Sequence, residues 1–168
     1  MPIIGVDSSG HVTKPPIYFV ASRRTKRKGQ RVKLVKISVR KHKEYIRLAT
    51  NVQLSHLFEK ISAVLIFRTI IGIYYAHDSI NIDTDFKGKS RKFVREYLSR
   101  LFQDRFVGDS KRNNPSITFV SSRIDEHVSD ADVKSKMAKD IKKAPMEIQR
   151  LWTILKDPKI NKGIDLLK

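Results

Sequence analysis

The sequence predicts a mixed α/β fold in which a single sheet carries helices on its faces. Strand-like apolar segments come first, and segments with helical apolar stripes then alternate with further strands. The chain has 168 residues, which is enough for one domain with a buried core and too few for two. We therefore expect a single domain over residues 1–157, followed by a loosely ordered C-terminal tail over residues 158–168.

The first part of the chain predicts three antiparallel strands. Residues 3–6 and 17–21 are rich in β-branched and aromatic side chains, with Gly and Pro in the turn between them. Apolar and basic residues alternate through residues 31–40, as in a half-buried strand. The stretch Lys28-Gly29-Gln30 supplies a turn, so the three strands form a meander.

Helices and strands alternate in the remainder of the chain. Thr50-Asn51 predicts a helix N-cap, and Ser129-Asp130-Ala131-Asp132 has the form of a capping box that opens a helix ending near Ala144. The other expected elements are a helix over 52–72, a strand over 79–82, a helix over 89–106, a strand over 116–120 and a helix over 146–156. The apolar stripe of the second of these helices consists of Phe93, Val94, Tyr97, Leu98, Leu101 and Phe102.

Three aspartates follow strands that are expected to be neighbours. Asp7 ends the first strand, and Asp83 and Asp85 end the fourth. A right-handed crossover places the fourth strand parallel to the first and next to it, so these carboxylates meet at one edge of the sheet. Neighbouring carboxylates repel one another, and Mg²⁺ or Mn²⁺ suits such an oxygen-rich cluster. The alternative is that each aspartate merely ends a strand or begins a turn.

The composition restricts the chemistry and favours a polyanionic partner. The chain contains no cysteine, which excludes disulfides, thiolate nucleophiles and cysteine-ligated zinc. Lys and Arg number 35 against 17 Asp and Glu, so the net charge is +18. Such an excess attracts nucleic acid through counterion release, and nucleic acid is therefore the expected partner. The alternatives are a solvated basic face or the ion-pair networks of a heat-adapted protein.

Basic residues gather at the tip of the hairpin between the second and third strands and again at the start of the second helix. They are expected to contact phosphates and not bases. A nuclear-type localisation signal is the alternative interpretation of the hairpin. The expected nucleic-acid-binding residues are Arg23, Arg24, Lys26, Arg27, Lys28, Arg31, Lys87 and Lys89.

The hydropathy pattern predicts no membrane partner. The most apolar window, residues 63–76, contains Arg68 and is too short to cross a bilayer. The first residues lack the basic and apolar regions of a secretory signal. We expect an intracellular, cytoplasmic protein, and the sequence leaves its oligomeric state open.

Three short stretches resemble motifs of the ribonuclease H-like superfamily. They are the first-strand aspartate in IIGVDSSG, the acids after the fourth strand in INIDTDF and the acid that opens a helix in HVSDADVKSKMAKD. The resemblance covers residues 3–144, and VDSSG and DTDFKGK also resemble an archaeal branch of that superfamily. It implies a mixed five-stranded sheet in the order 3-2-1-4-5, with strand 2 antiparallel and helices on the faces of the sheet.

The resemblance further implies a divalent-metal-dependent nuclease that hydrolyses phosphodiester bonds in nucleic acid by a two-metal mechanism, with Mg²⁺ or Mn²⁺. By this resemblance Asp7 would bridge the metals, Asp85 or Asp83 would complete their coordination, and Asp132 would come from the last core helix. His127, in the loop ahead of that helix, resembles a histidine that assists proton transfer or product release. The alternatives are a first-turn helix acid for Asp132 and a solvent-exposed loop histidine for His127.

One position departs from the pattern of the superfamily. Gln53 occupies the place of the acid expected near the start of the first helix, and Glu59 lies about 9 Å further along it. If neither residue serves, the chain would be a non-catalytic nucleic-acid-binding protein that keeps the fold, or it would use a metal site with fewer ligands. A structural protein of a large ribonucleoprotein is a third hypothesis. The chain also lacks the glycine-rich segment and paired asparagines that resemblance to hybrid-specific enzymes would require, so specificity for RNA–DNA hybrids does not carry over.

Overall fold

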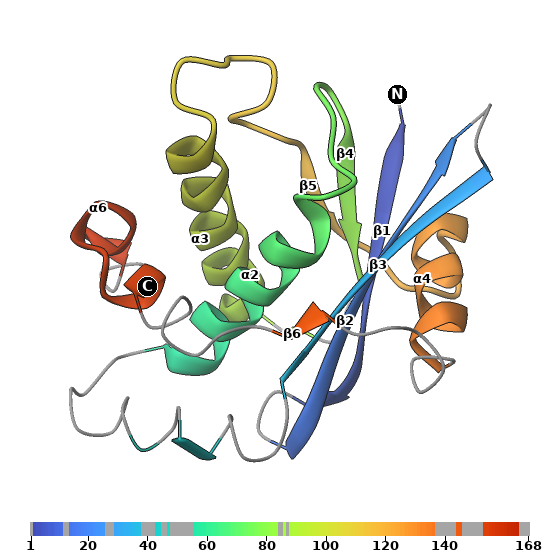
Figure 1. Ribbon diagram of the computed structural model, residues 1–168, viewed down its shortest axis with the longest axis horizontal. Coiled ribbons are helices and arrows are strands. Elements are labelled where there is room, and N and C mark those ends of the chain that lie inside the picture. Colours follow the sequence, from blue (N-terminus) through green and yellow to red (C-terminus); the bar gives the residue numbers. More distant parts are fainter. Residues whose placement is uncertain are drawn as a thin grey trace.

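A mixed sheet with helices on both faces organises the part of the chain that the computed structural model describes (Figure 1). The described residues are 2–11, 14–25, 29–37, 43–44, 47, 56–83, 86, 88–136, 144–145 and 153–164. Within them the sheet has six strands, in the order β5-β4-β1-β2-β3-β6. The mixed α/β class is therefore as predicted, whereas the described sheet has six strands and not the five that were expected.

The strands are β1 (Ile3–His11), β2 (Lys14–Thr25), β3 (Gly29–Ile37), β4 (Ser79–Ile82), β5 (Ile117–Phe119) and β6 (Ala144–Pro145). The helices are α2 (Leu57–Ile70), α3 (Lys89–Arg105), α4 (Glu126–Lys136) and α6 (Pro158–Asn161). Residues 153–156 are also helical. The expected turn residue Lys28, the helix N-cap Thr50-Asn51 and most of the helix predicted over 146–156 lie outside the described residues.

The first three strands follow one another as antiparallel neighbours. In β1 and β2, Ile4 lies opposite Arg23 and Asp7 lies opposite Val20. In β2 and β3, Ile17 lies opposite Ile37, and the pairing continues to the hairpin end of both strands. β1 is longer than predicted, so Asp7 lies inside this strand and does not end it.

The remaining strands pair in parallel on either side of the meander. β4 lies beside β1, with Val6 level with Ile82, and β5 lies beside β4. The two-residue β6 pairs with β3 at the other edge. The connection from β3 through α2 thus leads to β4, which pairs in parallel with β1.

Helices cover the two faces of the sheet unequally (Figure 1). α2 packs on β2, β3 and α3, whereas α4 packs alone on the other face against β1 and β2. The predicted stripe of α3 is confirmed, because its six apolar residues from Phe93 to Phe102 are all buried. They join the side chains of Ile4, Val6, Ile80 and Ile82 and nearly the whole of α2 in one core.

Two helix starts differ from the prediction. The described part of α2 begins at Leu57, after His56 in a left-handed conformation, and not at residue 52. α4 begins at Glu126, so the capping box predicted at Ser129-Asp130-Ala131-Asp132 is wrong and these residues lie within the helix. No helix in the described ranges is long and apolar enough to span a membrane.

The segment predicted as a loosely ordered tail is packed where the structure describes it. Asp157 caps α6 by accepting a hydrogen bond from the backbone N–H of Lys159 at 2.9 Å. Ile160 and Ile164 belong to the apolar core. Arg100 of α3 donates to the backbone carbonyl of Ile160 at 3.1 Å. The described part of residues 158–168 is therefore continuous with the domain.

Candidate functional site

Asp7 is a buried carboxylate in the middle of β1. Its exposed fraction is 4%. Side chains alternate along a strand, so Asp7 lies on the same face as Gly5. A Cβ placed on Gly5 would meet the backbone carbonyl oxygen of His127 at 1.9 Å, which identifies that face as the one covered by α4. Asp7 is therefore held on the α4 side of the sheet.

Asp83 occupies the neighbouring position on β4. Its backbone N–H donates to the carbonyl oxygen of Val6 at 2.9 Å, which extends the parallel pairing by one residue beyond Val6 and Ile82. Asp7 and Asp83 thus follow paired residues on adjacent strands, with backbones about 4.8 Å apart. The Asp83 carboxylate accepts a hydrogen bond from the backbone N–H of Ser122 at 3.3 Å. Since Ser122 lies in the connection to α4, both carboxylates belong to the α4 side.

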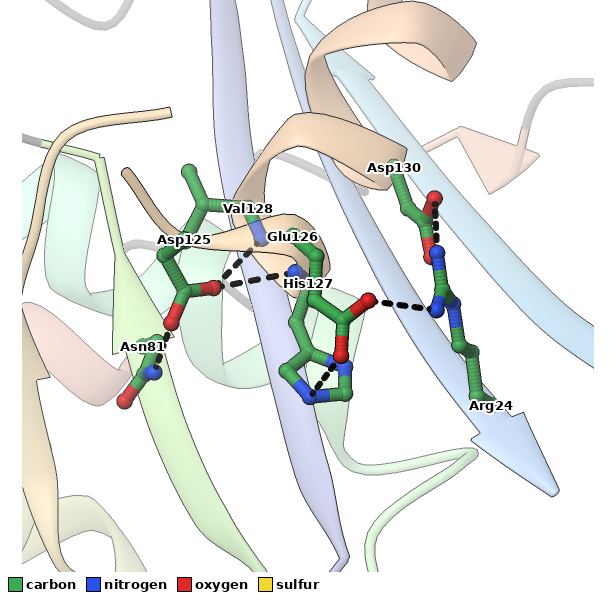
Figure 2. A network of polar contacts seen from close by, with 7 residues as sticks. All are labelled: Arg24, Asn81, Asp125, Glu126, His127, Val128 and Asp130. Carbon is green, nitrogen blue, oxygen red and sulfur yellow. Dashed lines mark hydrogen bonds and ion pairs between the residues drawn. The ribbon is translucent and has the colours of Figure 1, made fainter. Parts of the chain in front are cut away.

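Asp125 joins the N-terminus of α4 to Asn81 of β4 (Figure 2). One carboxylate oxygen of Asp125 accepts from the backbone N–H groups of His127 at 3.0 Å and Val128 at 2.9 Å, as an N-cap does. The other oxygen accepts from the side-chain amide of Asn81 at 2.7 Å. Asn81 is two residues before Asp83 on β4, so a single side chain fixes the start of α4 relative to the strand that carries the acid.

Arg24 is held by two acids of α4 (Figure 2). Its guanidinium contacts Asp130 at 2.5 and 2.9 Å and Glu126 at 2.8 Å. The hydrogen bond and charge of Asp130, with a smaller effect of Glu126, raise the pKa of Arg24 above its ordinary value. Arg23 makes a similar two-point contact with Asp78. These two residues, predicted to bind nucleic acid, are thus engaged by acids of the protein.

Glu59 lies in the first turn of α2 because that helix begins at Leu57. It is therefore near the start of α2, whereas the sequence predicted a place about 9 Å along the helix from Gln53. Its carboxylate accepts a hydrogen bond from the hydroxyl of Ser90 at 2.9 Å, at the contact between α2 and α3. The ring of His56 stacks on that of Phe93 at 4.3 Å beside it. Gln53 lies outside the described residues.

The remaining predicted residues of α4 lie within the helix. Asp132 is half-buried in the second turn and not at the helix start, where it was expected. His127 is in the first turn and not in a preceding loop. The imidazole Nε2 of His127 is 3.7 Å from a carboxylate oxygen of Glu126, and its buried Nδ1 has no hydrogen-bond partner.

The structure brings together part of the predicted acidic site. Asp7 and Asp83 are neighbours, whereas Glu59 is turned toward α3. Asp85 lies outside the described residues, as do Lys26, Arg27, Lys28 and Lys87. Arg31 lies in β3 and Lys89 is exposed at the start of α3. In the described ranges, no group of three or more histidine, aspartate or glutamate side chains is placed to hold a metal ion.

Sequence reasoning missed several residues around the acidic pair. Asn81, Ser122 and Asp125 form the polar frame that sets α4 beside β4. Asp125 could have been found, because an aspartate followed by a glutamate is a common helix start. Arg123, which follows Ser122, and Arg95, which lies over the ring of Phe119 in β5, were also not singled out, although residues 86–95 contain no acid.

Comparisons of the chain with protein-family models, with curated proteins and with solved structures found no match in any of the three.

Proposed function

We propose that the protein is a divalent-metal-dependent nuclease that hydrolyses phosphodiester bonds in nucleic acid. The observation that carries the proposal is the placement of Asp7, a carboxylate only 4% exposed, next to Asp83 on the α4 side of the sheet. A buried acid is uncommon in proteins, and Asp83 beside it is half-buried. Two carboxylates so close repel one another, and a divalent cation bound between them would relieve that repulsion.

The donor set fits a hard divalent cation. Both residues offer carboxylate oxygens, which Mg²⁺ and Mn²⁺ prefer, and the chain has no thiolate to favour a softer metal. Asp7 and Asp83 would hold the ion, and Asp85 and Asp132 remain proposed as further ligands. When bound, such ions stabilise the attacking and leaving oxygens of a phosphodiester displacement. The frame of Asn81, Ser122 and Asp125 would keep the acids in place.

The sheet supports a ribonuclease H-like fold as part of this proposal. Five strands follow the order β3-β2-β1-β4-β5, with β2 antiparallel to both of its neighbours. The crevice of an open sheet lies where the winding direction changes, which is between β1 and β4 here. Asp83 directly follows the carboxyl end of β4, and Asp7, in the middle of β1, lies level with it. Helices on both faces complete the arrangement that the superfamily resemblance implies (Figure 1).

Nucleic acid is the substrate class that the charge favours. The net charge of +18 far exceeds what solubility needs, and the acids of the described residues neutralise only part of the cations. A negatively charged backbone would be drawn toward the protein, and the two acids would repel it unless a cation were bound between them. The proposed metal therefore serves substrate binding as well as hydrolysis.

A second function is favoured by the position of Glu59. Its carboxylate is hydrogen-bonded to Ser90, away from the acidic pair, and the described residues contain no three-acid group. A chain with only two ligating carboxylates would bind nucleic acid without cutting it. In that case His127 and Asp132 have structural roles in α4, and binding does not need a metal.

The test compares cleavage of labelled hybrid, duplex, branched and single-stranded substrates by wild type, Asp7→Asn, Asp83→Asn and Asp104→Asn. Asp104 is an exposed acid of α3 and serves as the matched control. With Mg²⁺ or Mn²⁺ we expect wild type and the control to cleave. Loss of a ligating carboxylate should lower the cleavage rate by more than the about 10–100-fold that is typical when a residue hydrogen-bonded to a metal ligand is replaced. Equal cleavage by Asp7→Asn and wild type would refute the nuclease. Metal-independent binding without cleavage by any variant would establish the second function.

A further inference from the structure

We propose that the nucleic-acid backbone is bound by a cationic surface beside β5, formed by Lys89, Lys92, Arg95 and Arg123. We call these four residues the β5 cation surface. The inference rests on the proposed function for its substrate class, and it adds where the phosphates lie. They would cross the edge strand β5 next to Asp83, and the hairpin expected from the sequence would not be the principal contact.

The segment that leads into α3 contains basic residues and no acidic ones. Residues 86–95 contain five Lys and Arg and no Asp or Glu. Lys89, Lys92 and Arg95 are exposed on α3. Arg91 differs, because its Nε donates to the backbone carbonyl of Phe86 and so fixes the loop that leads into the helix. The exposed members therefore concentrate positive charge on the N-terminal half of α3.

Four other arginines of the described chain have acidic partners. Arg23 pairs with Asp78, Arg24 with Glu126 and Asp130, Arg100 with Glu96, and Arg112 with Asp109. None of the four residues of the β5 cation surface forms an ion pair with an acid that the structure describes. Cations without an acidic partner release more counterions when they bind a polyanion. The residues of the β5 cation surface should therefore contribute more to the binding affinity than Arg23 and Arg24.

Arg95 is positioned by aromatic side chains over β5. Its guanidinium lies 5.7 Å from the ring centroid of Phe119, which is the last residue of that strand. Phe119 in turn makes an edge-to-face contact with Phe86, at 5.9 Å between centroids. A guanidinium held against an aromatic face loses less freedom when it binds a phosphate, because part of its side-chain entropy is already lost.

The surface adjoins the acidic pair from two directions. Phe86, which supports Phe119 and through it Arg95, follows Asp83 by three residues in the sequence. Arg123 follows Ser122, whose backbone N–H binds the carboxylate of Asp83. β5 is the outer strand on this side of the described sheet, so no further strand covers the route. Lys89, Lys92 and Arg95 are on the α2 side of the sheet, and Arg123 is next to Ser122 on the α4 side, so a backbone bound by all four would cross the sheet edge at β5 to reach Asp83.

The test measures binding of short labelled single-stranded and duplex nucleic acid by fluorescence anisotropy in EDTA, over a range of salt concentrations. The variant is Lys92→Glu/Arg95→Glu, and the control is Arg105→Glu/Lys111→Glu, which makes the same change in net charge. Arg105 and Lys111 are exposed, and Arg105 lies about 15 Å along α3 from Arg95. Lys92→Gln/Arg123→Gln replaces the first variant if circular dichroism shows that it does not fold.

We expect the variant to bind at least about tenfold more weakly at moderate salt, with the slope of log K against log salt reduced by roughly 0.7–0.9 per lost phosphate contact. The control should change affinity by less than about threefold, because a distant charge is screened within about 10 Å. Equal weakening of variant and control would overturn the β5 cation surface and leave the proposed function intact. Absence of binding by the wild type in EDTA would also overturn the β5 cation surface, whereas the proposed function fails only if no substrate is cleaved with Mg²⁺ or Mn²⁺.

Discussion

The guanidinium of Arg23 makes two parallel hydrogen bonds to the carboxylate of Asp78, at 2.9 and 3.0 Å. The two residues are 55 positions apart, and the pair joins β2 to the turn that precedes β4. The Asp78 side chain is completely buried, and it also accepts from the backbone N–H of Tyr75 at 2.9 Å. The Tyr75 ring covers the guanidinium at 4.7 Å. This enclosed ion pair therefore holds β2 and the start of β4, the two neighbours of β1, in place.

Replacing Asp78 by alanine should destabilise the fold strongly. The change leaves the Arg23 guanidinium buried without its counter-charge, and breaking a buried pair in this way typically costs about 3–5 kcal/mol. Urea unfolding followed by circular dichroism measures the free energy of unfolding. The control is Asp104→Ala, which removes an exposed acid and should cost less than about 0.5 kcal/mol. A loss below about 1 kcal/mol for Asp78→Ala would show that the pair is not a structural contact.

Gly5→Ala should displace α4 or unfold the domain. A Cβ at this position would meet the carbonyl oxygen and carbon of His127 at 1.9 and 2.1 Å, and both are backbone atoms that cannot rotate away. We expect a cost at or above the upper end of the about 1–3 kcal/mol that overpacking usually brings. Hydrogen exchange of the α4 amides, read by mass spectrometry, would report the displacement.

Gly108→Ala is the control for Gly5→Ala. It distinguishes the loss of stability caused by a steric clash from the loss caused by backbone conformation. Gly108 has φ +81°, and a Cβ added there would meet nothing within 4 Å. Its cost should be only that of a left-handed backbone, about 1–2 kcal/mol, with α4 unchanged. If the two substitutions were equally tolerated and α4 exchange did not rise in Gly5→Ala, the close contact of β1 with α4 would be refuted.

Tyr74 should make stability fall at alkaline pH. Burial, with smaller effects from Asp78 and Asp109, raises the pKa of Tyr74 from 10.0 to about 12. A raised folded-state pKa contributes stability that is complete below pH about 10 and is lost as the pH rises through about 12. The hydroxyl also donates to the backbone carbonyl of Arg112 at 3.1 Å, and ionisation removes that donor.

Tyr74→Phe tests this assignment. At neutral pH the variant should be less stable by about 1 kcal/mol, because the hydrogen bond to Arg112 is absent. Between pH about 10 and about 12 it should lose less stability than the wild type, so that the difference between the two proteins shrinks. Urea unfolding at a series of pH values measures both curves. Curves that stay parallel through this range would exclude Tyr74 as the titrating group.

The parts of the fold that were predicted well depend on the spacing of apolar residues along a whole helix and on the rules for connecting parallel strands. The stripe of α3 depends on six apolar residues at helical spacing, and such a stripe has only one way to be buried. The neighbouring positions of Asp7 and Asp83 followed from the right-handed crossover, which depends on chain chirality and not on side-chain detail.

The features that were missed depend on contacts between distant residues. Asp125 and Ser129 are both good N-cap residues, and the choice was decided by Asn81 on β4, which binds Asp125. Arg23 and Arg24 belong to a basic run, yet Asp78, Glu126 and Asp130 engage them from more than fifty positions away. Spacing along the chain does not report such partners. In the proposed β5 cation surface, Lys89 was expected from the sequence, whereas Arg95 and Arg123 became candidates only after α3 and β5 were placed.

Asp125→Ala should loosen α4, whereas Ser129→Ala should not, although the sequence predicted Ser129 as the cap. Asp125 accepts from two backbone N–H groups of the first turn and binds Asn81, so its loss should cost about 1–2 kcal/mol for the cap and up to about 1.5 more for the side-chain contact. Asp125→Ser retains a capping oxygen, so it should restore the stability due to the cap but not the stability due to the contact with Asn81. Hydrogen exchange of His127 and Val128, together with urea unfolding, distinguishes the variants. Greater exchange in Ser129→Ala than in Asp125→Ala would place the cap three residues inside the helix and contradict this start of α4.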